Sequence, residues 1–235
     1  MECRHGPGRR RSGPAIRRRR VSVSVVGLSY AYKPSMPPVL RDVNHEFRSG
    51  HLTAITGPSG CGKSTLLYVL GLMLRPTSGV VMIDHEEVSA LPDVQRSRIR
   101  GGRIGFVFQD AVLDPSRSVM ANVLEGALFS PTAASSEDAL KLLAEFGVDR
   151  RATHRPGEIS GGQAQRVALC RALVKRPGIV LADEPTGNLD RASSEVVWNA
   201  LQNSARRLQA TVIVATHDEA LAARADEVLR LKVAT

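Results

Sequence analysis

The chain has 235 residues, of which 43% are hydrophobic, and a formal net charge of +9. This apolar content is enough for a folded core and excludes a chain that stays disordered throughout. No stretch approaches the ~18 consecutive apolar residues that a membrane-spanning helix needs, so any role at a membrane has to come through a partner. The length predicts one domain, or one domain with a subdomain.

The excess positive charge lies almost entirely in the first twenty residues. That segment holds eight arginines against one glutamate, a net +7, and the remainder carries only +2. The overall charge is therefore no argument that the folded part binds nucleic acid, and we expect no specific nucleic-acid partner. Residues 1–20 are rich in Arg, Gly and Pro and are predicted to form a disordered tail. Attraction to anionic lipid or nucleic acid is the functional alternative for this tail.

The three cysteines are scattered along the chain, at Cys3, Cys61 and Cys170. Because they form no Cys-x-x-Cys pair, neither a disulfide framework nor a zinc site is predicted. A reducing compartment fits them best.

Hydrophobic periodicity predicts strands that alternate with helices along the chain. In chain order we expect strands at 21–26 and 47–55, a helix at 63–73, a strand at 79–83, a helix at 92–100, a strand at 103–108, two weak helices within 119–147, a helix at 163–175, a strand at 179–182, a helix at 192–208, a strand at 211–215, a helix at 217–224 and a strand at 228–233. The run at 179–182 is wholly apolar, which is typical of a strand buried on both faces. The alternation predicts an α/β core with a parallel sheet.

A glycine-rich segment between the predicted strand at 47–55 and the helix at 63–73 matches the P-loop pattern G-x-x-x-x-G-K-[ST]. Glycines let the backbone curl so that its N–H groups point at phosphate oxygens, and the next helix presents its positive N-terminal end to the same anion. Lys63 can reach the β- and γ-phosphates, and the Ser64 hydroxyl can ligate Mg²⁺. The segment consists of Gly57, Pro58, Ser59, Gly60, Cys61, Gly62, Lys63, Ser64 and Thr65.

Two carboxylates, Asp183 and Glu184, follow the apolar run at 179–182. In open α/β sheets, ligands bind outside the carboxyl ends of the strands. Asp183 is therefore expected to face the Mg²⁺ shell and Glu184 the attacking water. A solvated acidic strand end is the plain alternative, but the P-loop in the same chain makes it improbable.

Four further segments occur in the order and at the spacings of one family. They are Ile159-Ser160-Gly161-Gly162-Gln163, Gln109 after an apolar strand, Asn188-Leu189-Asp190, and His217 after another apolar strand. They resemble the signature sequence, the Q-loop glutamine, the D-loop and the switch histidine of the ABC ATPases. The resemblance runs from about residue 21 to residue 233. It implies one ABC ATPase domain over 21–235, with a P-loop core, a mainly parallel sheet, an antiparallel β subdomain and an inserted helical subdomain at about 110–165.

The resemblance also implies a mechanism with ATP and Mg²⁺ as cofactors. Two ATP molecules would be held between two head-to-tail copies of the chain. Glu184 would be the general base, His217 would hold the γ-phosphate and position the water, and Asp190 would communicate across the dimer. Mg²⁺ would contact Ser64 and Asp183, and Gln109 would contact Mg²⁺ or water and report nucleotide occupancy to the partner. Each nucleotide would also meet the other copy's Ser160, Gly161, Gly162 and Gln163.

An aromatic residue near the start of the domain is expected to stack on the adenine. Tyr32 is the favoured residue because it lies immediately before the loop at 34–38, and loops carry binding residues more often than strands do. Tyr30 is the competitor, and either tyrosine could instead cap a strand. Stacking of an aromatic ring on a base is worth about 1–3 kcal/mol in nucleic-acid systems.

Residues 184–190, Glu-Pro-Thr-Gly-Asn-Leu-Asp, are most similar to one exporter-associated group of ABC ATPases. That group includes the lipoprotein-releasing, macrolide-export and cell-division ATPases and some bacteriocin-export ATPases. The likeness implies a cytoplasmic subunit at the inner face of the cell membrane that powers a separate integral membrane permease, an exporter, docked on residues 110–123. The alternative is an ATPase that regulates a membrane partner without transport, as in cell division.

Other P-loop classes fit the sequence less well. DNA-repair members of the family need a long coiled coil between the two halves of the site, and translation members carry two such domains per chain. A metabolic P-loop kinase would leave Ser160–Gln163 and His217 unexplained. A GTPase would need an Asn-Lys-x-Asp motif, which this sequence lacks.

Overall fold

The protein is described by a computed structural model covering residues 21–130 and 134–234. The arginine-rich segment 1–20, predicted to be a disordered tail, lies outside the described residues. Within the described parts, no helix is long and apolar enough to cross a bilayer.

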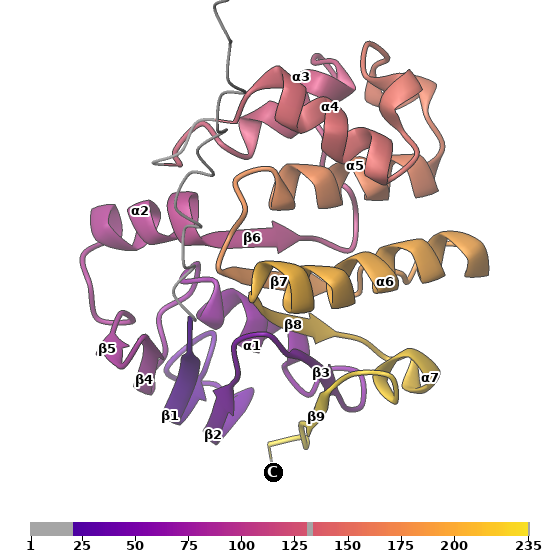
Figure 1. Cartoon of the computed structure of the whole chain (residues 1–235). Helices are drawn as coiled ribbons and strands as arrows, with labels where there is room; N and C mark the ends of the chain where they lie inside the picture. The colour runs from indigo at the N-terminus through magenta and orange to yellow at the C-terminus, as the bar shows by residue number, and fades with distance from the viewer. Residues whose placement is uncertain (1–20, 131–133, 235) are drawn as a thin grey trace, which may run out of the picture.

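The centre of the fold is a five-stranded parallel sheet in the order β6-β7-β8-β3-β9 (Figure 1). The two central strands β7 and β8 are buried along their whole length, which agrees with their apolar sequences. The expected α/β core with a parallel sheet is therefore confirmed. The strands are β6 (Ile104–Val107), β7 (Ile179–Asp183), β8 (Thr211–Ala215), β3 (Leu52–Thr56) and β9 (Glu227–Arg230).

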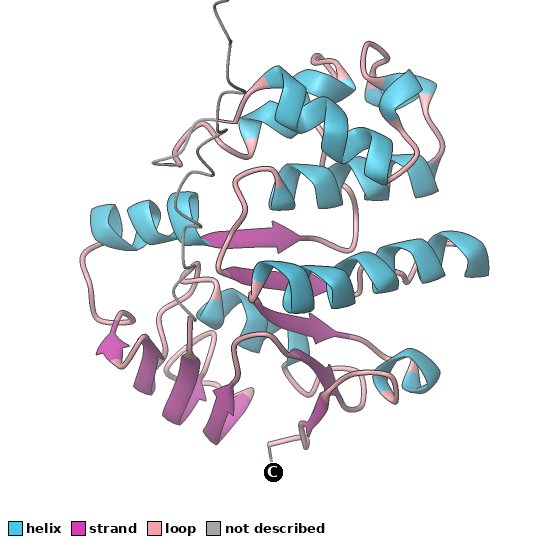
Figure 2. Cartoon of the chain, viewed as in Figure 1, coloured by secondary structure: helices cyan, strands magenta, loops and turns pink. Residues whose placement is uncertain are grey.

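A second, antiparallel sheet in the order β2-β1-β4-β5 packs beside the first, at the lower left of Figure 2. Its strands are β1 (Val23–Tyr30), β2 (Leu40–Phe47), β4 (Ser78–Ile83) and β5 (Glu86–Glu87). The prediction of one strand at 47–55 was wrong. The chain instead leaves the antiparallel sheet at Phe47, turns through Gly50 at φ +80°, and enters the parallel sheet at Leu52. β2 was missed because five of its eight residues are charged or polar and most are solvent-exposed or half-buried.

Helices cover both faces of the parallel sheet, and alternate residues of each central strand belong to different cores. Val180, Ala182, Val212 and Val214 pack in a cluster with Trp198 and Leu201 of α6. Ile179, Leu181, Ile213 and Ala215 pack in the other cluster with Leu66 and Leu67 of α1. The helices are α1 (Lys63–Leu70), α2 (Asp93–Arg103), α3 (Val119–Glu125), α4 (Ser136–Glu145), α5 (Gly161–Leu173), α6 (Arg191–Leu208) and α7 (Glu219–Ala222), with 3-10 turns η1 (Asp149–Arg151) and η2 (Pro156–Glu158).

The segment between β6 and β7 is helical, and α3 and α4 lie on the side of α5 that faces away from the strands (Figure 1). Gly126, which follows α3, lies against the backbone of α5. A Cβ atom placed there would lie 1.9 Å from the carbonyl oxygen of Arg171. The limits of a helical subdomain at about 110–165 stay a prediction.

Replacing Gly126 by alanine is expected to destabilise the fold by about 3 kcal/mol, because the new methyl group has to push α3 away from the backbone of α5. Equilibrium urea unfolding measures this. Gly157→Ala is the matched control, because a Cβ at Gly157 would meet no atom within 4 Å. Equal unfolding midpoints for the two variants would contradict the close packing of α3 on α5.

Candidate functional site

The strand order brings four loops to one edge of the parallel sheet. In the paired register, Asp183 of β7 lies beside Ala215 of β8, and Ala215 lies beside Ile55 of β3. The loops that follow these strands therefore start side by side. Val107 pairs with Ala182, so the register places Gln109, two residues further along, level with Glu184.

At two positions of the P-loop, the backbone conformation and the close packing leave room only for glycine. Gly57 has φ +149°, and a Cβ there would lie 2.5 Å from the carbonyl oxygen of Leu231. Gly62 has φ +96°, and a Cβ there would lie 2.7 Å from Leu40. Glycine at both points lets the chain turn directly from β3 into α1, whose N-terminal N–H groups form an anion-binding end.

The Lys63 ammonium group is held over this loop. Its Nζ donates hydrogen bonds to the carbonyl oxygens of Gly57 at 3.0 Å and Pro58 at 3.4 Å. The positive charge therefore lies at the same loop as the backbone N–H groups. An ammonium group that also finds phosphate oxygens makes the stronger, charge-assisted kind of hydrogen bond.

A pair of oxygen ligands lies next to the P-loop. The Ser64 hydroxyl donates to the Asp183 carboxylate at 2.9 Å, so α1 and the end of β7 are joined directly. Among the described residues, no group of three His, Cys, Asp or Glu side chains could hold a metal ion by itself. Mg²⁺ is typically bound by one or two protein oxygens together with phosphates and water, so Ser64 and Asp183 fit that ion.

Tyr68 also interacts with Asp183, and this interaction raises the pKa of Tyr68; the sequence reasoning missed it. Burial raises the pKa of Asp183 above its ordinary value of 3.8, against hydrogen bonds from Ser64 and Tyr68 and the charge of Lys63, which lower it. The signal for Tyr68 was present, because residues four apart share one face of a helix and Tyr68 is four residues after Ser64.

Glu184 and His217 form the second pair at this edge. The Glu184 carboxylate lies 2.8 Å from His217 Nδ1 and accepts the backbone N–H of His217 at 3.2 Å. The Glu184 side chain is 13% exposed, whereas that of His217 is 71% exposed. Glu184 also has φ +43°, a strained conformation for a residue other than glycine, and such strain clusters at functional sites. The carboxylate thus has one oxygen held and oriented, which suits a base that acts on a water molecule.

Gln109 lies close to the loop that follows β7 and to the start of α5. Together with Gly161, Pro185 and Asn188 it lines a cavity of about 250 Å³. A Cβ at Gly187 would lie 4.0 Å from the Gln109 amide nitrogen, so this side chain is close to the turn that follows Glu184. Its predicted contact with Mg²⁺ or water stays a prediction.

Ser160 caps the N-terminus of α5 in a capping box. Its hydroxyl accepts the N–H of Gln163 at 3.3 Å, and the Gln163 side chain accepts the N–H of Ser160 at 2.9 Å. Ser160 and Gly161 are exposed, and among the described residues no hydrogen bond joins residues 160–163 to the P-loop. Within the described part of one chain, the turn at 160–163 is therefore not hydrogen-bonded to the P-loop.

Asp190 caps α6 in a similar way. Its carboxylate accepts hydrogen bonds from the N–H of Ser193 at 2.9 Å and from the Ser193 hydroxyl at 2.8 Å, and these bonds lower its pKa. A role for Asp190 across a dimer stays a prediction, but its side chain is already fixed in place.

The two candidate adenine platforms differ in exposure. Tyr32 is 57% exposed and its hydroxyl lies 2.9 Å from that of Thr65 on α1, so the ring stands beside the P-loop helix. Tyr30 is 9% exposed at the end of β1 and touches Tyr32 edge to face, with ring centroids 5.1 Å apart. Only Tyr32 offers a free ring face, which supports the prediction in its favour.

A sequence profile described as ABC transporter matches residues 40–187. The chain belongs to the ABC transporter family. It is an ATP-binding domain of that family, an ATPase that uses ATP with Mg²⁺.

Two similar proteins share the name lipoprotein-releasing system ATP-binding protein LolD. The protein of Roseobacter denitrificans is 44% identical over 195 residues, 82% of this chain and 86% of that protein. The protein of Xanthomonas axonopodis pv. citri is 40% identical over 213 residues, 90% of this chain and 87% of that protein. A dimeric post-hydrolysis structure of the ATP-binding cassette MJ0796 with ADP and Pi has a TM-score of 0.83 and 36% identity, and the match covers 89% of this chain and 94% of that one.

Replacing Lys63 by alanine should weaken ATP binding about 10- to 100-fold, because a charge-assisted hydrogen bond to phosphate is lost. Titration calorimetry with Mg-ATP measures the affinity. Lys141→Ala removes an exposed lysine of α4, paired with Glu137, and serves as the control. Unchanged ATP affinity in the Lys63 variant would contradict the role of the P-loop lysine.

Replacing Asp183 by asparagine should raise the melting temperature of the nucleotide-free chain at neutral pH. Because burial raises the pKa of Asp183 above 3.8, the ionised carboxylate destabilises the folded state wherever both states are ionised. The gain should be complete above the raised folded-state pKa and disappear as the pH falls below the unfolded value. The same variant should lose the added stability that Mg-ATP gives the wild type. Scanning fluorimetry tests both effects, and a lower melting temperature without nucleotide would contradict the first.

Proposed function

We propose that this chain is the ATP-hydrolysing subunit of a membrane-bound ABC complex of the lipoprotein-releasing type, working as a pair of copies on a separate permease. The observation behind this proposal is that the site is divided: the P-loop cluster and the signature turn at 160–163 share no hydrogen bond within the described part of one chain. One edge of the sheet gathers Lys63, Ser64, Asp183, Glu184 and His217. Ser160 instead stands exposed at the start of α5, where its described hydrogen bonds go to Gln163.

A second copy completes such a site. The exposed signature turn of one protomer has a hydroxyl, backbone N–H groups and the positive end of α5, all of which suit a phosphate. Two head-to-tail copies would each present this turn to the other's P-loop. The γ-phosphate would then bridge the copies, and its hydrolysis would release them. The cassette MJ0796, similar in fold, is described as dimeric.

Each residue of the cluster has a distinct part in hydrolysis. Bound Mg²⁺ would supply positive charge to the phosphates, held by Ser64 and Asp183. Glu184 takes the proton of the attacking water, with its carboxylate held in place by His217. The His217 ring is exposed on its other side, so its second nitrogen would be available to the γ-phosphate. Tyr32 stacks on the adenine ring of the nucleotide, and the P-loop binds its phosphates.

The lipoprotein-releasing assignment rests on the names of the relatives, which include both proteins quoted above and others from Myxococcus xanthus and further Xanthomonas strains. We place the subunit at the inner face of the cell membrane, docked on its permease through residues 110–123. Macrolide exporters and cell-division regulators remain the alternatives within the same group. Identification of the membrane protein that purifies with this chain separates the three.

Glu184→Gln tests the shared catalytic site. The amide cannot take a proton, so steady-state ATP hydrolysis should fall about 100-fold or more while ATP still binds. Because ATP is then retained, the variant should elute as a dimer with Mg-ATP in size-exclusion chromatography with light scattering. Near-normal hydrolysis would reject Glu184 as the base.

Two further variants complete this experiment. Glu195→Gln alters an exposed glutamate of α6 that pairs with Arg224, and it should hydrolyse ATP as the wild type does. Ser160→Arg added to Glu184→Gln should abolish the ATP-dependent dimer, because the large side chain fills the place of the other copy's γ-phosphate. A dimer that persists in this double variant would overturn the divided site.

A further inference from the structure

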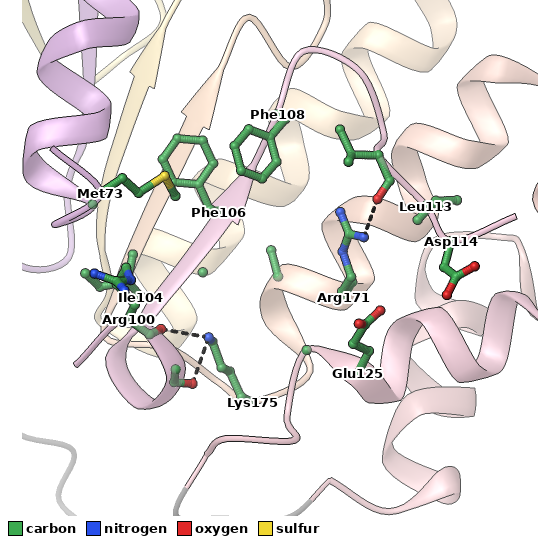
Figure 3. Close-up of a pocket in the computed structure, with 16 residues that line it drawn as sticks. Met73, Arg100, Ile104, Phe106, Phe108, Leu113, Asp114, Glu125, Arg171 and Lys175 are labelled. Carbon is green, nitrogen blue, oxygen red and sulfur yellow. Dashed lines mark hydrogen bonds between the residues drawn. The ribbon is translucent and has the colours of Figure 1, made fainter. Parts of the chain in front are cut away.

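Three aromatic side chains form a continuous row on the face of the parallel sheet that α1 covers. The rings of Tyr68 on α1 and Phe106 on β6 have centroids 5.8 Å apart, with their planes tilted by 35°. The rings of Phe106 and Phe108 have centroids 4.4 Å apart, and both line an apolar groove of about 540 Å³ between α2, β6 and the α3–α5 pair (Figure 3). The row therefore runs from this groove to α1.

The two phenylalanines of the row are held by the elements around them. A Cβ atom at Gly71, which follows α1, would lie 3.3 Å from the Phe106 ring, so this ring packs against the end of α1. The Phe108 carbonyl oxygen accepts a hydrogen bond of 2.8 Å from the side chain of Gln165, a buried residue of α5. Because folded interiors are close-packed, the Tyr68 ring rests on a neighbour that has little room to move away.

The sheet register places the acidic strand end beside this row. Phe106 pairs with Leu181, and Asp183 lies two residues after Leu181, on the same face of β7. Tyr68 interacts with the Asp183 carboxylate. The buried residues of α1 are aliphatic apart from Thr65, whereas Tyr68 is half-buried. A tyrosine here combines an apolar ring with a hydroxyl, and such a hydroxyl usually finds a polar partner when its ring is packed.

The Asp183 carboxylate needs more than one donor to hold one orientation. Ser64 donates to only one of its oxygens, at 2.9 Å. The last torsion of an aspartate side chain has a broad energy minimum, so a carboxylate held at one oxygen can still rotate. Tyr68 is four residues after Ser64, about one helical turn away on the same face of α1. The two hydroxyl groups therefore approach the carboxylate from two points of one helix.

We propose that Tyr68 is a positioning residue for magnesium, whose phenol group keeps the Asp183 carboxylate turned toward the place that Mg²⁺ takes beside Ser64. The proposal rests on the proposed function, in which Ser64 and Asp183 hold Mg²⁺, and it adds the residue that orients the carboxylate. Loss of a residue that orients a metal ligand typically costs about 10- to 100-fold in metal affinity or activity. Mg²⁺ demands near-ideal octahedral geometry, whereas Ca²⁺ accepts flexible arrangements at longer distances, so the orientation matters most for Mg²⁺.

Four variants separate this role from simple packing. Tyr68→Phe keeps the ring on Phe106 and removes the hydroxyl, and Tyr68→Leu removes the ring as well. Asp183→Asn removes the charge of the ligand itself. Ser204→Ala is the control, because Ser204 is also a buried residue whose hydroxyl is lost, and that hydroxyl donates at 2.8 Å to Ala200 O within α6.

Titration calorimetry measures the dissociation constant of the nonhydrolysable ATP analogue AMP-PNP for each chain with Mg²⁺, with Ca²⁺ and with EDTA. The ratio of the EDTA value to the metal value is the gain from the metal. Tyr68→Phe should lower the gain from Mg²⁺ about tenfold and that from Ca²⁺ less than about threefold. Its affinity in EDTA should equal that of the wild type, because the P-loop still binds the phosphates.

The other variants show what the ring contributes. Tyr68→Leu should lose the same gain from Mg²⁺ as Tyr68→Phe does, and it should melt at a lower temperature because the aromatic packing on Phe106 is lost. Ser204→Ala should keep the gain of the wild type. A residue that only fills space would leave the selectivity between Mg²⁺ and Ca²⁺ unchanged.

Fluorine NMR reports on the phenol itself. The chain is labelled with 3-fluorotyrosine, and replacement of each of the three tyrosines in turn by phenylalanine assigns the resonances. Addition of Mg²⁺ to the wild-type chain with AMP-PNP should shift the Tyr68 resonance, because the carboxylate beside the phenol then has a metal ion as a second neighbour. In Asp183→Asn the same addition should leave this resonance nearly in place.

Three results would overturn the proposal. The gain from Mg²⁺ could be unchanged in Tyr68→Phe, the loss of affinity could be equally large in EDTA, or the Tyr68 resonance could stay in place when Mg²⁺ is added to the wild type. If Asp183→Asn loses the gain from Mg²⁺ in these cases, the magnesium site stands and only the role of Tyr68 fails. If Asp183→Asn keeps the gain, the proposed role of Asp183 fails together with it.

Discussion

The parallel pairing of β7 with β8, and of β8 with β3, is the constraint on which the rest of the structure depends. It places Asp183, Ala215 and Ile55 side by side, so the P-loop, the acidic pair and the histidine loop all start at one edge. The Ser64–Asp183 hydrogen bond then ties α1 to that edge. A slip of one residue in either pairing would turn the buried side chains of the strand to the other face, so the two cores protect the geometry of the site.

Helix α5 explains why one chain holds only half of a site. Its buried residues pack in the core cluster that also contains residues of α3 and α4, and this packing keeps its N-terminus with the helical segment. The capping box of Ser160 and Gln163 preforms the turn without any ligand. The turn is thus held by two hydrogen bonds and exposed, and a preformed surface of this kind loses little conformational entropy on binding.

The chain also links two surfaces through one short strand. β6 forms a wall of the apolar groove, and the residue two positions after its end is Gln109, in the cavity beside Gly161 and Asn188. A strand such as β6 can transmit a displacement from one side to the other only if it is packed tightly on both sides. The parallel pairing of β6 with β7 fixes this strand on its inner side.

The sequence alone determined the P-loop, the acidic pair, the signature turn and the switch histidine, because each depends on local spacing within a strand, a turn or the first turn of a helix. The wholly apolar runs likewise predicted β7 and β8. Only the tertiary structure decided which of these segments come together. Glu184 meets His217, and Asp183 interacts with Tyr68, whereas Ser160 is hydrogen-bonded to Gln163 of its own turn. It also revealed β2, whose polar residues hide its pairing with β1. It further showed that Lys175 donates hydrogen bonds to the carbonyl oxygens of Arg100 and Gly101 in α2. Local pattern sets the conformation of each element, but contacts between elements distant in sequence depend on how their apolar faces pack, which no short stretch of sequence encodes.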